Sequence, residues 1–287
     1  MKRIAIVGSI FLFFSGAWAN QTRMNTLIAG DYIDDPVNIS VFPQHIMIFQ
    51  NYFYGDIFNN SHDYGMVFAP KSEYGGLAIW NSDQFCAGYG ITLKRFDLGL
   101  YGSPIEDHTR LGIGIGRAYF DSRIDVSFIM NNGDSLDVEN FHINVRLLKR
   151  KMDFVIIPRY TFSHNVEPAS YTQHRAGLML QKLILNEGFV FLAGEYLNSK
   201  GDVDSSCASF LGGIELPLSR VVTLRMGCKE VLNLDQGVTT ADLLLEPGVG
   251  FRIREFNLDF HVNQGRLFNK DLTFVESFGL DLNFGKF

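Results

Sequence analysis

Apolar and polar residues alternate along most of this 287-residue chain, and this period of two constrains the fold more than any other feature. In the run 124–130, isoleucine, valine, phenylalanine and methionine occupy every second position, with aspartate and serine at two of the three positions between them. The same order returns at 141–147, 256–262 and 278–284. Because successive side chains of a β-strand point to opposite faces, each run gives a strand with one apolar and one polar face. The sequence therefore predicts an all-β protein.

The connections between the runs favour a membrane barrel over a soluble β-sandwich, which would show the same alternation. Counted back from the C-terminus, tight turns alternate with longer polar loops, as they do in outer-membrane barrels. The tight turns are predicted at 94–95, 121–122, 149–151, 186–188, 218–220 and 254–255, and the loops at 103–110, 131–140, 163–174, 198–206, 230–241 and 263–273. With further runs at about 45–54, 63–70 and 75–82, we predict a closed antiparallel transmembrane β-barrel of about 14–16 strands over residues 45–287.

The first 19 residues have the layout of a cleavable export signal. Two basic residues precede an apolar run at 4–14, and Ala17 and Ala19 frame an A-x-A cleavage site. An uncleaved membrane anchor would need about 20 apolar residues, more than this run offers. We therefore expect a signal peptide at 1–19 and a mature chain that begins at Asn20. No later stretch reaches 18 consecutive apolar residues, so the mature chain can cross a bilayer only as a closed barrel, whose backbone groups are all paired.

Residues 20–44 lack the alternation of a strand and form the candidate for a plug inside the barrel. The candidate plug residues are Asp34 and Asp35, which precede a proline, and Phe42 and Pro43. A barrel of about 16 strands has a lumen wide enough for a water channel or an inserted segment.

The polar faces of the predicted strands carry charges of both signs. The lumen-lining candidates are Asp97, Asp125, Arg146, Arg159, Glu195, Glu215, Arg225, Glu246, Arg252 and Asp259. Mixed signs on neighbouring strands pair across a lumen, whereas charges of one sign would focus ions. The sequence therefore favours a braced wall or a narrow polar channel over strong ion selectivity.

Composition and motifs point away from nucleic-acid binding and from catalysis. The formal net charge is −6, and a basic stripe is missing. No G-x-S-x-G motif occurs, and a serine and histidine side by side at 163–164 in a predicted loop do not make a preorganised catalytic pair. The glycines of 112–116 are followed by a strand rather than a helix, which argues against a dinucleotide site and for close contacts in the lumen. We expect no enzyme activity and no cofactor.

The histidines and cysteines show no metal-ligand spacing. The seven histidines form no i, i+4 pair, so we expect no metal site, and we interpret His142 and His261 as solvated lumen residues. The three cysteines lack a C-x-x-C motif. One disulfide between Cys207 and Cys228 stays open, although buried, unpaired thiols are the favoured interpretation.

Two segments resemble known families. The C-terminal sequence LDLNFGKF resembles the terminal strand by which outer-membrane proteins are recognised for barrel insertion, with Phe284 and Phe287 as the candidate insertion signal, although its apolar positions are one step out of the usual parity. The sequence AGDYIDDPVNISVFPQ at 29–44 is similar to the opening of the long-chain fatty-acid transporter superfamily and of related barrels associated with type IX secretion. It keeps the acidic pair and Pro43 but lacks the Asn and Gly of their Asn-Pro-Ala-Gly turn.

These resemblances imply an outer-membrane protein, with barrel-insertion machinery and outer-membrane lipid as partners and with an N-terminal segment folded into the lumen. We predict a channel or transporter for small or amphipathic solutes, including hydrophobic ones. One alternative is a non-conducting barrel that assembles or anchors protein partners, and the other is a secreted soluble β-sandwich that binds a ligand.

Overall fold

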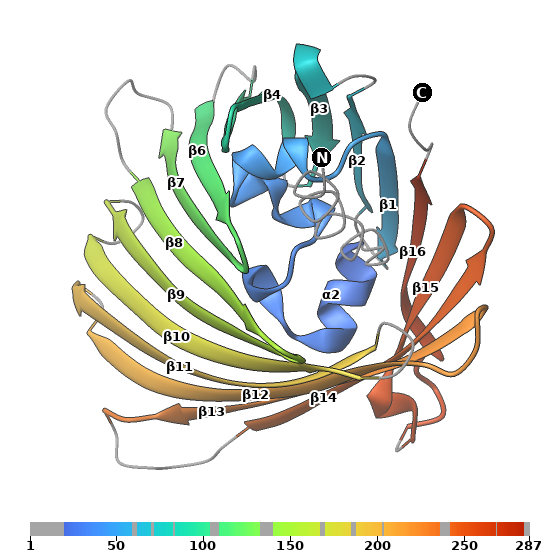
Figure 1. The fold of residues 1–287 in the computed structure, drawn as a ribbon. Coiled ribbons are helices and arrows are strands. Elements are labelled where there is room, and N and C mark those ends of the chain that lie inside the picture. Colours follow the sequence, from blue (N-terminus) through green and yellow to red (C-terminus); the bar gives the residue numbers. More distant parts are fainter. Residues whose placement is uncertain are drawn as a thin grey trace.

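Sixteen antiparallel strands form a closed barrel within the part of the chain that the computed structural model describes (Figure 1). Each strand pairs with its neighbours in the sequence, and β1 (Tyr52–Phe58) closes the ring against β16 (Val275–Asn283). This confirms the predicted all-β barrel, at the upper end of the expected strand number, and rules out the sandwich. The described residues are 20–58, 62–69, 72–82, 84–103, 109–132, 140–166, 170–184, 188–202, 204–235, 242–267 and 269–283.

The strands lengthen from the first third of the chain to the middle. Between β1 and β16 they are β2 (His62–Phe68), β3 (Gly76–Asn81), β4 (Phe85–Leu93), β5 (Phe96–Gly102), β6 (Thr109–Tyr119), β7 (Ser122–Asn132), β8 (Asn140–Lys151), β9 (Phe154–Asn165), β10 (Tyr171–Leu183), β11 (Phe189–Gly201), β12 (Ser205–Pro217), β13 (Val222–Asn233), β14 (Asp242–Ile253) and β15 (Phe256–Val262). Among the described residues, two short helical turns, η4 (Ser72–Tyr74) and η6 (Gln264–Leu267), lie between strands.

The alternation of the sequence separates an apolar outer face from the lumen. On β7, Ile124 and Phe128 are exposed on the outside, whereas Asp125 and Ser127 are buried inside. Large apolar side chains such as Ile113 and Leu192 are 60% and 70% exposed on this outer face. None of the described helices is both long and apolar enough to cross a membrane.

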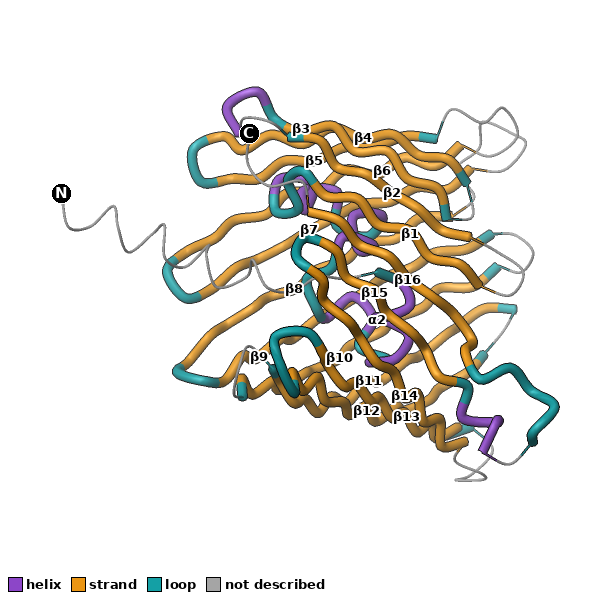
Figure 2. Tube along the Cα trace, turned by 90° about the vertical axis from the view of Figure 1, so that its right-hand side faces the viewer, coloured by secondary structure: helices purple, strands orange, loops and turns teal. Residues whose placement is uncertain are grey.

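Four two-residue turns close hairpins at one end of the barrel (Figure 2). Their first residues, Lys94, Phe120, Met152 and Arg254, have φ between 49° and 59°, the left-handed conformation that reverses a chain within two residues. Two of the predicted turns lie at other positions in the structure. The basic run 149–151 lies within β8, so that turn comes later than predicted, and the turn predicted at 121–122 begins one residue earlier, at Phe120.

The segment 20–51, called the inner segment below, lies inside the ring of strands (Figure 1). It contains α2 (Gln21–Leu27), η1 (Gly30–Tyr32), η2 (Pro36–Ser40) and η3 (Pro43–Met47). The side chain of Asn20 caps α2 by accepting from the Arg23 N–H, and prolines begin η2 and η3, where their missing N–H costs nothing.

The barrel wall begins at Tyr52 and not at residue 45 as predicted, because residues 45–51 continue the inner segment. Their apolar side chains pack into the lumen. Ile46 is fully buried in a cluster with Trp80 of β3 and Tyr101 of β5. A second cluster surrounds Leu27 of α2 and includes Phe191 of β11. Parts of the lumen wall are therefore an apolar core, although the sequence indicated a polar face.

The three cysteines are free thiols. Cys207 shares the inner face of β12 with Glu215, because odd-numbered residues of this strand point inward. On β13, Arg225 points inward, because it forms an ion pair with Glu215. Cys228 lies three residues further along the strand, so it points outward, opposite Gly212. The barrel wall separates these two thiols, which excludes a disulfide between them in this fold.

Candidate functional site

Arg146 on β8 is the centre of the largest polar contact between the barrel wall and the inner segment. Its guanidinium is fully buried and pairs with Asp34 of the inner segment and, at 2.9 Å, with Asp125, which lies directly opposite on β7. It also donates to the carbonyl oxygens of Asp31 and Tyr32, and its Cζ lies 4.8 Å from the ring centre of Phe42. Burial alone would raise the pKa of Asp34, but Arg146 together with His45 holds that pKa below its ordinary value.

Asp125 extends this contact along the wall. Gln44 of the inner segment donates to its carboxylate at 3.1 Å, and His45 Nε2 lies 3.3 Å from it. Arg123 bridges Asp125 at 2.9 Å and Asp97 of β5 at 2.7 Å. Because the buried carboxylate of Asp125 binds groups from the inner segment and from β8, it fixes the position of the inner segment against the wall.

Arg23 of α2 is the centre of the second polar contact, which involves strands β12 and β13 of the wall. It forms a two-pronged ion pair with Glu215 of β12, with N···O distances of 2.6 and 3.1 Å, and reaches Asp35 at 3.4 Å. Glu215 also pairs with Arg225 of β13 at 2.6 Å, and Arg225 pairs with Asp259 of β15. Burial raises the pKa of Asp35 to about 7, against the opposing charge of Arg23.

The start of α2 is fixed by carboxylates of the wall. Asp56 on β1 accepts the backbone N–H groups of Gln21 and Thr22 at 2.9 and 2.8 Å, which satisfies two unpaired donors of the helix terminus. The amide of Asn20 donates to Asp259 at 3.0 Å. Between the two large contacts, Arg159 of β9 pairs with Asp31 and, at 3.5 Å, with Glu195 of β11.

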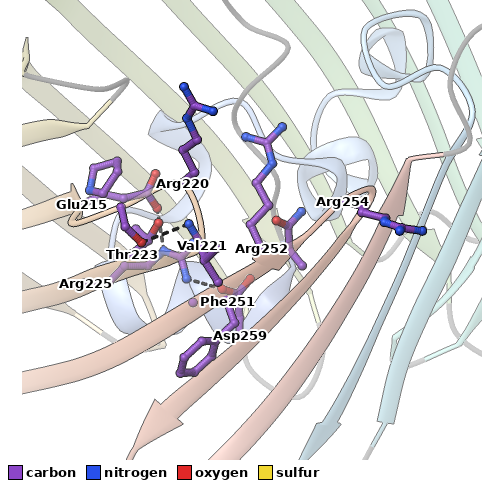
Figure 3. Close-up of a pocket in the computed structure, with 13 residues that line it drawn as sticks. Glu215, Arg220, Val221, Thr223, Arg225, Phe251, Arg252, Arg254 and Asp259 are labelled. Atoms are coloured by element: carbon purple, nitrogen blue, oxygen red, sulfur yellow. Dashed lines mark hydrogen bonds and ion pairs between the residues drawn. The ribbon is translucent and has the colours of Figure 1, made fainter.

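Two cavities lie towards opposite ends of the barrel, and the smaller of them is lined in part by the inner segment. The larger, of about 790 Å³, opens at the tight-turn end and is called the turn-side cavity (Figure 3). Arg220, Arg252 and Arg254 line it together with Glu215, Asp259 and their partner Arg225 (Figure 3). The turn-side cavity is therefore rich in arginine.

The smaller cavity, of about 440 Å³, is called the loop-side cavity. It is lined by Met24 and Asn25 of α2 and by wall residues that lie towards the long connections, such as Phe58 at the end of β1 and Glu276 near the start of β16. No described residue lines both cavities, and the Arg23–Glu215 ion pair of α2 lies between them.

The predicted site residues fall into three groups. The charged residues 97, 125, 146, 159, 195, 215, 225 and 259 form ion pairs inside the barrel, and Glu246 contacts the imidazole of His261. Arg252 is exposed in the turn-side cavity. Of the plug candidates, Asp34 and Asp35 pair with arginines, Phe42 lies under Arg146, and Pro43 begins η3 beside Gly99. Phe284 and Phe287 lie outside the described residues.

Several functional contacts were not predicted. Arg23, Gln44 and His45 carry the docking of the inner segment, yet no local pattern marks them. His261 is only 4% exposed and not solvated as expected, because Glu246 covers it. His142 is half-buried and contacts Ser163 at 2.8 Å.

Asp281 and Asp125 give a matched pair of buried carboxylates. Both are fully buried, but Asp125 has several donors, whereas neither oxygen of Asp281 has a hydrogen-bond partner among the described residues. Asp281→Asn removes a buried carboxyl that at neutral pH must either hold an unpaired charge or take up a proton on folding, and we expect it to raise the free energy of unfolding by about 1 kcal/mol or more. Asp125→Asn should lower it by about 3 kcal/mol, because Arg146 and Arg123 lose their shared partner. Urea unfolding of the two variants in one detergent checks the opposite signs; a loss of stability in Asp281→Asn contradicts this reasoning.

Comparisons with known proteins agree with the barrel fold. The chain is similar to a structure described as a bacterial polysaccharide outer membrane secretin, with 10% identity, a TM-score of 0.50, and coverage of 82% of this chain and 97% of that one. It is also similar to OmpTdeltaL8, a loop L8 deletion mutant of OmpT, an outer membrane protein of Vibrio cholerae, with 8% identity, a TM-score of 0.50, and coverage of 80% and 97%.

No protein-family model matches the sequence, and no curated protein sequence matches it. The resemblance to long-chain fatty-acid transporters is not shown by these comparisons and stays a prediction. The structural likenesses are at low identity and show the fold alone. The chain has the closed antiparallel fold of outer-membrane β-barrel proteins.

Proposed function

We propose that this protein is an outer-membrane channel for small or amphipathic solutes and that the inner segment is its gate. The observation that carries the proposal is a pair of cavities, of about 790 and 440 Å³, towards the two ends of the barrel. The smaller is lined in part by α2, and the larger is lined by Glu215 and Asp259, which bind Arg23 and Asn20. A solute in the smaller cavity meets α2, and a solute in the larger cavity meets the wall carboxylates that hold Asn20 and Arg23. Displacement of the inner segment would therefore join the two spaces into one path.

The contacts that hold the inner segment suit a reversible gate. Arg23, Asp34 and Asp35 dock through ion pairs and hydrogen bonds, for which water can substitute when the segment moves. If the chain is cut before Asn20, as the sequence predicts, Tyr52 is the point at which the segment joins the wall. The segment could then swing without a change in any strand.

A non-conducting anchor is the second candidate function. Its supporting observation is the packing of the inner segment into two apolar clusters, around Leu27 and Ile46, which resemble the core of a globular protein. In that case the segment would brace the barrel permanently, and partners would bind outside the lumen.

Solute entry into proteoliposomes separates the two functions. The purified mature protein should admit small sugars at a rate that falls as the sugar grows, and planar bilayers should show brief openings, because the docked state dominates. Liposomes made without protein and liposomes that contain heat-unfolded protein are the controls. Protein that folds, as shown by heat-modifiable migration in a gel, and yet admits no sugar and conducts no current would contradict the channel and favour the anchor.

A further inference from the structure

Three side chains with metal-ligating atoms converge on the wall of the loop-side cavity. They are Glu246 of β14, His261 of β15 and Glu276 of β16, and one ligand atom of each lies within 4.8 Å of the others. His261 Nε2 contacts the carboxylate of Glu246, and its Nδ1 lies 3.8 Å from Glu276 Oε2. Among the described residues, no other group of three or more His, Cys, Asp or Glu side chains brings its ligand atoms this close together.

The local structure of the wall places these side chains together. Glu246 and His261 both point into the lumen, since His261 pairs with Gly248, two residues beyond Glu246 on the same face. Glu276 would point away from the lumen in a regular strand, next to the inward-facing Ser277. The pairing of β15 with β16 shifts at this point, from His261↔Ser277 to Val262↔Val275, so Glu276 is the extra residue of a β-bulge. The bulge redirects its side chain towards His261.

The charges of this group favour a cation. A neutral imidazole has one N–H, but both ring nitrogens of His261 face a carboxylate. Even a charged imidazolium would leave one negative charge in excess. Arg175 and Lys229 line the same cavity, yet neither forms an ion pair with Glu246 or Glu276 in the described part of the chain.

We propose that Glu246, His261 and Glu276 form a binding site for a divalent transition metal ion of the Zn²⁺ class. One imidazole nitrogen and two carboxylate oxygens are ligands for such ions, whereas Ca²⁺ and Mg²⁺ prefer oxygen alone. Ligands of a tetrahedral Zn²⁺ lie roughly 3.3 Å apart, which small rotations of the side chains provide, above all at Glu276, whose side chain is 47% exposed.

The fourth coordination position would face the loop-side cavity of about 440 Å³. It would be open to water or to a solute with a metal-binding group. This inference goes beyond the proposed channel and does not depend on it, because metal binding is measured on the purified protein without any flux.

The test is titration of the tag-free, detergent-solubilised protein with Zn²⁺ in competition with a chromophoric chelator. The wild type should bind one Zn²⁺ per chain through this site, and His261→Asn and Glu246→Gln should each weaken binding by about 100-fold or more. The matched controls are His62→Asn, an exposed histidine on β2, and Glu255→Gln in a tight turn at the other end, and both should bind like the wild type. Co²⁺ in place of Zn²⁺ should give visible absorption bands that disappear in His261→Asn.

Folding of each variant is checked by heat-modifiable migration. If the variants at the more buried positions fail to fold, Glu276→Gln provides the test, because Glu276 is exposed. We expect this variant to bind Zn²⁺ at least 10-fold more weakly than the wild type. A wild type that binds no Zn²⁺ overturns the proposal. So does an affinity in folded His261→Asn or Glu276→Gln that equals the wild-type value.

Discussion

Gly227→Ala is expected to release the inner segment from the barrel wall. A Cβ atom at this position of β13 would lie 2.6 Å from the carbonyl carbon of Leu27 and 2.7 Å from the carbonyl oxygens of Thr26 and Leu27. These are backbone atoms, which cannot rotate away as a flexible side chain can. The clash should cost about 2 kcal/mol, which shifts the equilibrium between docked and released segment roughly 30-fold towards release.

Trypsin measures this release, because Arg23 is the one lysine or arginine in residues 20–51 and is fully buried in the docked state. Cleavage after Arg23 therefore reports the population of released segment, and mass spectrometry of the barrel detects it. Gly194→Ala on β11 is the matched control, since its Cβ would meet nothing within 4 Å. Equal cleavage rates for the two variants would show that the segment is not held against Gly227.

Arg146→Met is expected to cause a severe loss of stability. Methionine fills much of the volume of arginine but leaves the carboxylates of Asp34 and Asp125 without their shared buried partner. Removal of one member of a buried ion pair costs about 3–5 kcal/mol, because the remaining charge stays desolvated. Unfolding by urea, followed through the fluorescence of buried Trp80, should show a strongly lowered midpoint.

Lys149→Met is the control for this experiment. Lys149 lies on the same strand and also forms an ion pair, at 2.8 Å with Asp121, but both side chains are about half exposed. Water and salt screen such a pair, so its loss should leave the midpoint unchanged. If Arg146→Met unfolds at the same urea concentration as Lys149→Met, the buried contact is not what docks the inner segment.

The strands were predictable because their outer face needs apolar side chains at every second position. Ile124 and Phe128 illustrate this rule, and Asp125 between them is buried inside the barrel. The limits of β1 were not predictable in the same way. Residues 46–49 are apolar, as the outer face of a strand requires, but Ile46 is apolar because it packs in the lumen against Trp80 and Tyr101.

The partners of the charged residues were beyond sequence reasoning for a different physical reason. Arg23 and Glu215 are 192 positions apart, and only closure of the barrel around α2 brings them together. Phe191 points into the lumen, where the inner segment rather than water is its neighbour. The convergence of Glu246, His261 and Glu276 depends on register and on a β-bulge, neither of which the spacing of these residues indicates.

A reversible lock between the inner segment and the wall tests the gate most directly. A Cβ atom at Gly248 of β14 would lie 2.9 Å from the Cβ of Thr26, closer than the roughly 3.8 Å of a disulfide, so the inner segment must move about 1 Å from the wall to admit the bond. We would introduce Thr26→Cys and Gly248→Cys into a chain in which serine replaces the three native cysteines, with Thr26→Cys alone as the control. Sugar entry into proteoliposomes should be abolished in the oxidised protein and restored by reductant, and it should not respond to reductant in the control. Equal entry before and after reduction of a fully formed disulfide would contradict a gate made by residues 20–51.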